Sequence, residues 1–224
     1  MSKIENRALV ELVYEKIKYM IDEGVLQPGE KVNKGELVEK LGVSQTPINE
    51  ALNKLAGEKI LEQRSRQGFF IRQYSYLELS RLFELRASIE GMAARLCVEQ
   101  LQEEGLNHIV KIFDNFVLPL SEQGAIDYLH ADKIFHESLV KYSGNSFLVE
   151  TSISSGYLLK SNQKGLLRSA EETLPEHMAL IGALKNRDAP LAQELTIMHL
   201  LKTRDLLRKI GTTGTLPLPG RPDR

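Results

Sequence analysis

The stretch Gly42-Val43-Ser44-Gln45-Thr46-Pro47-Ile48-Asn49-Glu50-Ala51-Leu52-Asn53-Lys54-Leu55 sets the organisation of the N-terminal third of the chain. Ser44 is a favourable N-cap, and Pro47 is tolerated in a first helical turn, where no intrahelical N–H bond is lost. Apolar residues then recur at helical spacing, at Ile48, Leu52 and Leu55. The stretch therefore predicts an amphipathic helix whose exposed N-terminal end carries amides and hydroxyl groups.

Two interpretations of this helix stay open from the stretch alone. Amides and hydroxyls suit the base edges of a DNA groove, and free backbone N–H groups at a helix start suit phosphate. An ordinary amphipathic surface helix shows the same pattern. The flanking segments favour the first interpretation.

The flanks predict two further helices and a hairpin. Leu9–Glu23 has helical periodicity and ends before Gly24, and Asn33 is a suitable N-cap for a short helix that runs to Leu41. After the central helix, two strand-like runs cover residues 60–63 and 69–72. The segment between them carries two arginines and reads as a hairpin tip, Arg64-Ser65-Arg66-Gln67-Gly68. Three helices followed by a two-stranded wing make a winged helix-turn-helix.

Several short motifs carry a resemblance to a known family, at the expected spacing: Gly24-Val25-Leu26-Gln27-Pro28-Gly29, Leu41-Gly42-Val43-Ser44, Thr46-Pro47, Glu50-Ala51-Leu52 and Arg66-Gln67-Gly68-Phe69-Phe70. Residues 8–72 resemble the DNA-binding domain of the GntR family of bacterial transcription regulators. The resemblance implies binding to double-stranded operator DNA. We expect DNA contacts from the start of the central helix and from the wing, at Ser44, Gln45, Thr46, Asn49, Arg64, Arg66 and Gly68.

Two of these positions depart from the family pattern. The family often has arginine where this chain has Gln45, and nearly always where it has Asn49. Arginine is the usual bidentate reader of guanine, whereas Asn and Gln pair best with adenine. We therefore expect DNA binding, with Asn49 reading adenine or making no base contact.

Composition bounds the class of protein. The 224 residues carry a formal net charge of −1, and residues 1–73 hold 12 Lys and Arg against 11 Asp and Glu. Duplex binding usually depends on excess positive charge, but Arg64, Arg66 and Arg72 cluster on or beside the wing with no acidic residue between them. The single cysteine, Cys97, excludes an internal disulfide framework. No apolar run approaches about 18 residues, the length typical of a membrane-spanning helix, so we expect a cytoplasmic protein without membrane contact.

At Gln73-Tyr74-Ser75 the sequence changes from a mixture of helix and strand patterns to helical patterns alone, and we place a domain boundary there, between residues 1–73 and 74–211. The second domain has helical periodicity throughout, with Thr173-Leu174-Pro175-Glu176 as a capping box. Residues 212–224 contain three prolines, so we expect a disordered tail there. The expected fold class is mainly α, with a winged helix-turn-helix followed by six helices over residues 76–103, 106–121, 124–142, 145–165, 173–186 and 189–210.

Four polar residues of the second domain fall on apolar helix faces. Asp132 and His136 are four residues apart and share a face, while His177 and His199 lie within the apolar stripes of two later helices. Each histidine alone is compatible with a hydrogen-bonded core imidazole, and Asp132 alone with a salt bridge. Together, one carboxylate and three imidazoles form a ligand set suited to a divalent metal ion such as zinc, nickel or manganese.

A second resemblance rests on these residues and on others of the same domain: Leu85-Arg86 with Glu90, Asp132 with Phe135-His136, Glu176-His177 with Ile181 and Ala183-Leu184, and Arg187-Asp188 ahead of His199. Residues 76–210 resemble the FCD effector-binding domain of the FadR-type subfamily of GntR regulators. The resemblance implies that Asp132, His136, His177 and His199 hold a divalent metal and that a small carboxylate binds next to it. Six helices rather than seven are typical of the VanR-like branch.

Arg86 has two interpretations. It lies four residues before Glu90 within the span of an apolar stripe, so the two side chains can form an internal ion pair. Alternatively, Arg86 offers a guanidinium fork to a carboxylate effector, and Glu90 holds it in place.

These observations predict an effector-responsive transcription regulator, a homodimeric repressor whose operator affinity is controlled by a small organic acid. The alternative is a helical metalloenzyme that uses the same four residues for hydrolysis, with Glu137 or Glu176 as the base. Each of these glutamates follows or precedes a candidate ligand by one residue, about 100° around the helix, and so points away from the expected metal.

Overall fold

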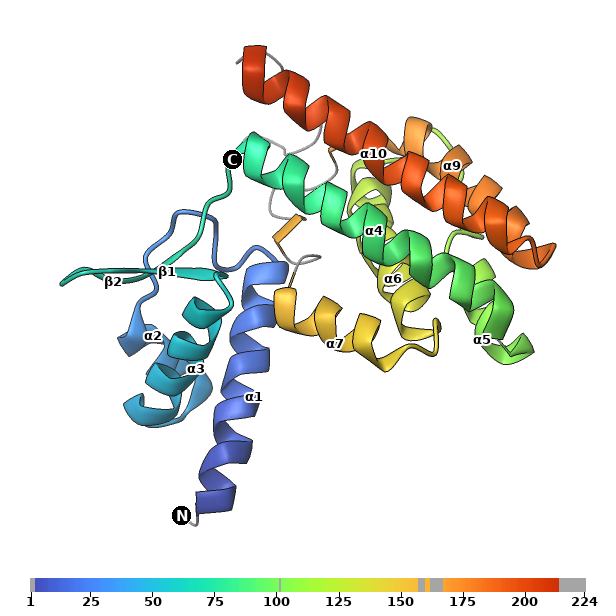
Figure 1. Ribbon diagram of the computed structural model, residues 1–224. Coiled ribbons are helices and arrows are strands. Elements are labelled where there is room, and N and C mark those ends of the chain that lie inside the picture. Colours follow the sequence, from blue (N-terminus) through green and yellow to red (C-terminus); the bar gives the residue numbers. More distant parts are fainter. Residues whose placement is uncertain (1–2, 101, 157–159, 162–166, 214–224) are drawn as a thin grey trace. The chain divides into compact units, whose positions relative to one another are not determined.

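The computed structural model describes residues 3–100, 102–156, 160–161 and 167–213. The chain divides into two compact units, Met1–Tyr74 and Ser75–Arg224. Each unit is described by itself below. Their elements are labelled in Figure 1.

The N-terminal unit contains three helices and a two-stranded sheet: α1 (Lys3–Asp22), α2 (Lys34–Leu41), α3 (Gln45–Gly57), β1 (Leu61–Arg64) and β2 (Gly68–Ile71). Asn33 caps α2 as expected, because its side-chain oxygen accepts hydrogen bonds from the backbone N–H groups of Gly35 and Glu36. Gly42 ends the helix in the left-handed conformation, with φ of 65°. This sharp end to α2 allows α3 to begin three residues later.

Burial of one face of each helix makes the core of this unit. Ile17 of α1 and Ile48, Leu52 and Leu55 of α3 are each 0% exposed, and Leu37 of α2 is 2% exposed. Full burial of one such side chain contributes about 1.5–3 kcal/mol. The apolar spacing of the opening stretch therefore corresponds to the buried face of α3, and the opposite face remains available for binding.

The wing is an antiparallel hairpin in which Leu61 pairs with Ile71 and Arg64 pairs with Gly68. Residues 65–67 form its tip. Arg66 has a φ of 60° and Gly68 a φ of 100°, a backbone region that glycine adopts without strain. The guanidinium of Arg64 lies 4.1 Å from the ring centroid of Phe70, so the aromatic ring supports the arginine at the base of the tip.

The described part of the C-terminal unit is helical. Its helices include α4 (Tyr76–Gln100), α5 (Glu103–Val110), α6 (Glu122–Lys141), α7 (Ser146–Ser155), α9 (Ala170–Lys185) and α10 (Ala189–Thr213). The two longest, α4 and α10, lie side by side (Figure 1). Gly91 permits this approach, because a Cβ atom at that position would lie 2.6 Å from Cγ1 of Ile197. The expected fold class, a mainly helical chain with a winged helix-turn-helix first, is confirmed.

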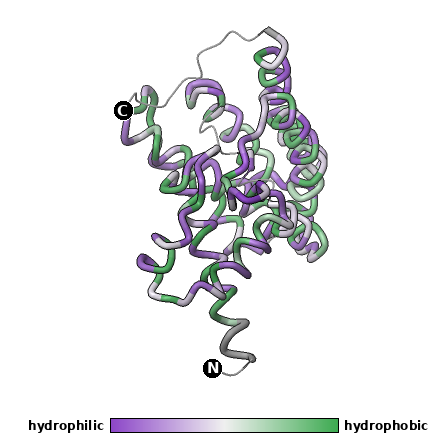
Figure 2. The backbone as a smooth tube through the Cα atoms, turned by 90° about the vertical axis from the view of Figure 1, so that its left-hand side faces the viewer, coloured by the Kyte–Doolittle hydropathy of each residue, from purple (hydrophilic) through white to green (hydrophobic). Residues whose placement is uncertain are grey.

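The core of the C-terminal unit joins α4, α5, α6, α9 and α10. Its central residues include Cys97, Ile109, Tyr128, Phe135 and Ile181. Hydrophobic and hydrophilic residues alternate along the helices instead of separating into long apolar segments (Figure 2). Among the described residues, no helix is long and apolar enough to cross a membrane.

Several expected helix boundaries are wrong. The helix expected over 106–121 ends at Val110, followed by turns through residue 115. The helix expected over 145–165 is interrupted after Ser155, because Gly156 adopts the left-handed conformation and caps α7. Residues 157–159 and 162–166 of the expected span lie outside the described residues. The helices expected to begin at residues 106 and 124 begin earlier, at Glu103 and Glu122.

The expected capping box at Thr173 is also wrong, because α9 begins at Ala170 after Ser169. The hydroxyl of Thr173 donates back to the carbonyl of Ser169 at 3.0 Å. At the C-terminus, α10 extends to Thr213, so the expected tail begins two residues too early. The remainder of that tail, residues 214–224, lies outside the described residues.

Candidate metal centre and nucleic-acid interface

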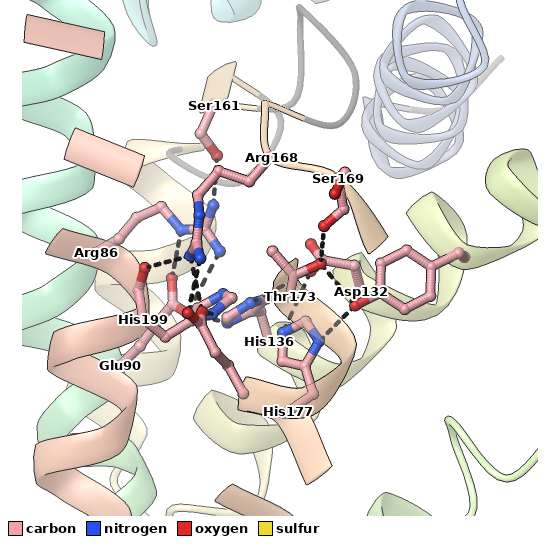
Figure 3. A network of polar contacts seen from close by, with 12 residues as sticks. Arg86, Glu90, Asp132, His136, Ser161, Arg168, Ser169, Thr173, His177 and His199 are labelled. Atoms are coloured by element: carbon pink, nitrogen blue, oxygen red, sulfur yellow. Dashed lines mark hydrogen bonds and ion pairs between the residues drawn. The ribbon is translucent and has the colours of Figure 1, made fainter. Parts of the chain in front are cut away.

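Three helices bring four expected residues into one cluster. Asp132 and His136 come from α6, His177 from α9 and His199 from α10, and one ligand atom from each lies within 4.8 Å of the others. The three histidines are buried, and Asp132 is partly exposed. Oδ1 of Asp132 lies 3.4 Å from Nε2 of His177 and 3.8 Å from Nε2 of His136. The four side chains converge in Figure 3.

The other ring nitrogen of each histidine contacts a second residue. Nδ1 of His136 lies 2.5 Å from Oε2 of Glu90, and Nδ1 of His199 lies 2.7 Å from Oε2 of Glu176. These contacts orient the rings, as second partners do for metal-binding histidines generally.

His177 is held by neutral partners. Its Nδ1 lies 2.9 Å from the hydroxyl of Tyr128, and the ring of Phe113 stacks on the imidazole with a centroid separation of 4.6 Å. The opposite nitrogen, Nε2, is buried and has no hydrogen-bond partner among the described residues. A buried polar atom without a partner is costly, and a metal ion is one group that would satisfy it.

The protonation states suit a cation. Burial lowers the pKa of His177 well below its ordinary value, and the neighbouring His199 and His136 add to the effect. Burial also lowers the pKa of His199, although its hydrogen bond with Glu176 opposes the shift. Both imidazoles are therefore neutral at physiological pH, the form that binds metals. The donor set fits a divalent ion, and the cluster could hold one.

A cavity of about 40 Å³ adjoins the cluster. Its lining includes Arg86, Asp132, His136 and His199 together with apolar side chains. This volume leaves room for only a few water-sized groups. The space beside the cluster therefore suits a small ligand.

Arg86 forms the expected ion pair with Glu90 and also lines the cavity. Its side chain is 3% exposed, and its Nε lies 2.7 Å from Oε1 of Glu90. Its Nη1 donates to the hydroxyl of Ser161 at 3.2 Å. Burial raises the pKa of Glu90, but Arg86 and His136 outweigh it and hold the value at about 2. Glu90 is thus an anion that contacts both an expected metal ligand and an arginine of the cavity wall.

Sequence reasoning missed several residues of this site. Tyr128 lies four residues before Asp132 on α6, so helical spacing could have identified it. Arg168 precedes α9, in a segment without periodicity that would mark it. Glu176 is not placed as a base in the cluster. Its carboxylate contacts Nδ1 of His199 and so orients that ring.

The other expected residues lie in the N-terminal unit. Ser44, Gln45 and Thr46 are exposed at the start of α3, and the Ser44 hydroxyl makes no capping hydrogen bond within the helix. Backbone N–H groups of a first helical turn have no intrahelical partner. This end of the helix therefore offers several donors to a phosphate or a base edge.

Asn49 is partly buried, and its Oδ1 is buried without a hydrogen-bond partner among the described residues. Reading adenine requires both the oxygen and the nitrogen of the amide at the base edge. The Asn49 amide must therefore turn before it can make the expected bidentate contact.

On the wing, Arg64 and Arg66 are exposed and Gly68 is partly exposed. Nε of Arg64 lies 3.2 Å from Oε1 of Glu62 on the same strand. An ion pair with both partners this exposed is weak, so it leaves Arg64 able to contact phosphate. The structure thus brings the wing residues together at one tip.

Both units of the chain match known protein families. Residues 9–71 match the family "Bacterial regulatory proteins, gntR family", and residues 81–202 match the FCD domain. The chain is 30% identical to the Nta operon transcriptional regulator of Aminobacter aminovorans, over 82% of this chain and 87% of that protein. It is 27% identical to the probable D-xylose utilization operon transcriptional repressor of Paenarthrobacter nicotinovorans, over 80% of each chain.

The solved structure of Escherichia coli McbR/YncC has the same fold, with a TM-score of 0.74 and 21% identity, covering 90% of this chain and 97% of that chain. The matched families and relatives are regulators rather than enzymes, so the hydrolytic alternative is not supported. The VanR-like branch stays a prediction. The chain belongs to the GntR family of bacterial transcription regulators and carries an FCD effector-binding domain behind its DNA-binding domain.

Proposed function

We propose that this regulator is a metal-containing repressor. In this proposal a homodimer binds a two-fold operator, and a small carboxylate bound beside a divalent metal ion releases it. The observation that carries the proposal is the cluster of Asp132, His136, His177 and His199, whose ligand atoms lie within 4.8 Å of one another.

The metal would be held by Asp132 and by the Nε2 atoms of the three histidines. The support for this assignment is that each Nδ1 already contacts another residue, at 2.5 to 2.9 Å. One carboxylate and three neutral imidazoles suit zinc, nickel or manganese. Bound there, the ion would supply positive charge and free coordination positions for an incoming carboxylate.

Arg86 would bind the effector directly. Its buried guanidinium lines the cavity beside the cluster, and Glu90 fixes its position. A guanidinium fork matches a carboxylate in geometry and charge. The small cavity favours short hydroxy, keto or dicarboxylic acids over long fatty chains.

Repression and dimerisation rest on different support. The Paenarthrobacter relative is named a probable repressor, which favours release of DNA as the effect of ligand. A helix-turn-helix that reads one half-site per subunit gains affinity by pairing, and closed two-fold dimers are the commonest oligomers.

Native mass spectrometry of protein purified without a chelator tests the proposal. We expect dimers with close to one divalent ion per chain, and an added mass if a small acid is retained. Chelation should remove the ion and lower the melting temperature, because a ligand that binds only the folded state stabilises it. The proposal would be contradicted by metal-free monomers whose melting temperature does not change when chelator or divalent ions are added.

A further inference from the structure

A chain of buried hydroxyl groups joins His177 to the N-terminal end of its own helix, α9, through a tyrosine of α6. Nδ1 of His177 lies 2.9 Å from the hydroxyl of Tyr128, and that hydroxyl lies 2.9 Å from the hydroxyl of Thr173. The Thr173 hydroxyl lies 3.0 Å from the backbone carbonyl oxygen of Ser169. Tyr128 and His177 are 0% exposed and Thr173 is 5% exposed, so water does not compete for these bonds. Ser169, Thr173 and His177 lie along one side of the network in Figure 3.

The backbone carbonyl at the end of this chain sets the direction of every bond in it. A carbonyl oxygen only accepts hydrogen bonds, so the single O–H of Thr173 is directed at Ser169. The oxygen of Thr173 then accepts from Tyr128, whose only proton is used in that bond. The oxygen of Tyr128 must therefore accept from His177, and Nδ1 of His177 carries the ring proton. Because a neutral imidazole has one such proton, Nε2 is left with a lone pair.

The opposite direction is less favourable for two reasons. If Thr173 donated to Tyr128 and Tyr128 to Nδ1, the carbonyl of Ser169 would lose its side-chain donor, and the chain would contain two hydrogen bonds in place of three. The ring proton would then lie on Nε2, which is buried and has no hydrogen-bond partner among the described residues. Oδ1 of Asp132 lies 3.4 Å from this nitrogen without forming a hydrogen bond with it. A buried donor without an acceptor is costly.

The other two histidines of the cluster reach the same protonation pattern through charge. Nδ1 of His136 lies 2.5 Å from Glu90, and Nδ1 of His199 lies 2.7 Å from Glu176. An ionised carboxylate only accepts, so the ring proton of each neutral imidazole lies on Nδ1. His177 has no carboxylate at Nδ1, and a hydroxyl by itself can either donate or accept. The chain of hydroxyl groups removes this ambiguity.

We propose, on the basis of the function proposed above, that Thr173 is a positioning residue of the metal centre. Acting through Tyr128, its hydroxyl keeps the ring proton of His177 on Nδ1 and leaves the lone pair of Nε2 free for the metal ion. Without the Thr173 hydroxyl, Tyr128 can donate to Nδ1, and the ring proton moves to Nε2. A metal ion must then displace that proton in order to bind.

Long-range ¹H–¹⁵N NMR spectra of the ¹⁵N-labelled, metal-free protein test the assigned tautomer, because protonated and unprotonated ring nitrogens have different ¹⁵N chemical shifts. The signals of His177 are identified by their absence from His177→Gln. We expect the ring proton on Nδ1 in wild type and in Thr173→Ser, which keeps the hydroxyl. Thr173→Val should move the proton, wholly or in part, to Nε2.

Competition titration of Zn²⁺ against a chromophoric chelator measures the consequence for metal binding. Thr173→Val should weaken zinc binding about 10- to 100-fold, the range for outer partners of metal-binding histidines, and Thr173→Ser should bind zinc as wild type does. Tyr128→Phe should also weaken it, because Nδ1–H then lacks its acceptor. Thr196→Val is the matched control and should keep wild-type affinity. Thr196 is buried on α10 and donates to the carbonyl of Ala192 at 2.8 Å, outside the chain of hydroxyl groups.

Melting temperatures of all variants separate a specific loss of metal binding from a general loss of folding. The inference is wrong if the ring proton of wild-type His177 lies on Nε2, or if Thr173→Val binds zinc as wild type does. An equal loss of zinc affinity in Thr173→Ser and Thr196→Val would also contradict it, because packing rather than the hydroxyl chain would then be responsible. Failure of the proposed function gives a different result. Wild type would bind none of Zn²⁺, Ni²⁺ and Mn²⁺, while its His177 proton would still lie on Nδ1 and still move in Thr173→Val.

Discussion

Each of the three clustered histidines has Nδ1 within 2.9 Å of a second residue. This arrangement leaves Nε2 as the nitrogen that could bind a metal. The contacts come from Glu90, Tyr128 and Glu176, and so from α4, α6 and α9. The site is therefore specified by residues that would not touch the metal as well as by those that would.

Replacing any one of His136, His177 or His199 by Ala should abolish tight metal binding. Three remaining ligands hold a divalent ion weakly, so we expect metal content to fall from about one ion per chain to a small fraction of that value. Elemental analysis after dialysis measures the change. His130→Ala is the matched control, because His130 lies on the surface of α6, outside the cluster. Full occupancy in all three variants would place the metal elsewhere.

The metal-free protein should lose stability as the pH falls. Burial lowers the pKa of His177 and of His199 in the folded state, so the unfolded state binds more protons below the ordinary histidine value of about 6.5. The free energy of unfolding must then decrease as the pH drops through that region. The pKa of Glu90, about 2 against an ordinary 4.5, extends the loss to lower pH.

Urea unfolding with chelator present, followed at several pH values between about 7.5 and 5.5, measures this slope. His177→Gln should have a smaller slope than wild type, and the exposed His130→Gln should match wild type. A wild-type stability that stays constant over this range would show that the cluster is already protonated when folded.

At the scale of elements, the contact between α4 and α10 depends on a single glycine. A Cβ atom at Gly91 would lie 2.6 Å from Ile197, whereas one at Gly182, within α9, would have nothing within 4 Å. Gly182→Ala should therefore raise the free energy of unfolding by about 0.5–1 kcal/mol through helix propensity. Gly91→Ala should lower it by about 1 kcal/mol or more, because overpacking outweighs the same propensity gain. Equal effects of the two variants in urea unfolding would show that α10 shifts freely.

Also at the scale of elements, the role of Asn49 in DNA binding by helix α3 can be tested. Asn49→Ala should cost about 1–3 kcal/mol of operator affinity, concentrated at one base pair. Binding to a set of operator variants, each with one base pair changed, measures this. The effect requires the buried amide oxygen to turn outward on binding. A uniform loss across all sequences would identify Asn49 as a backbone contact.

At the scale of the molecule, the proposed function requires ligand binding in the FCD domain to change the DNA affinity of a dimer. A ligand shifts this equilibrium only by its different affinity for the two states. Such coupling is typically about 1–3 kcal/mol, so operator affinity should fall about 5- to 150-fold when the acid is saturating. Fluorescence anisotropy with labelled operator, at fixed salt concentration, measures the change.

Arg86→Ala provides the test of that coupling. The variant should bind the acid more weakly and should need a correspondingly higher acid concentration to release DNA. Its operator affinity without acid should equal that of wild type. An Arg86→Ala protein that binds acid and releases DNA as wild type does would leave Arg86 as a structural partner of Glu90.

Much of the fold could be predicted because it depends on short-range chemistry. The side chain of Asn33 caps its own helix, and apolar residues three or four apart define the buried face of α3. The spacing of Asp132 and His136 also places them on one face of one helix. The same logic anticipated the Arg86–Glu90 ion pair, which closes over a single helical turn.

Other features of the site depended on which helices pack against one another. Periodicity identifies the buried face of a helix but not the helix that packs against it, so it could not pair Glu176 with His199, 23 residues apart. Nor could it place Arg168 in the lining of the same cavity as Arg86. The sequence by itself determined the winged helix-turn-helix, the helical class of the second domain and the four candidate ligands. Only tertiary packing decided the ring orientations, the cavity and its second arginine, because these rest on contacts between residues far apart in the chain.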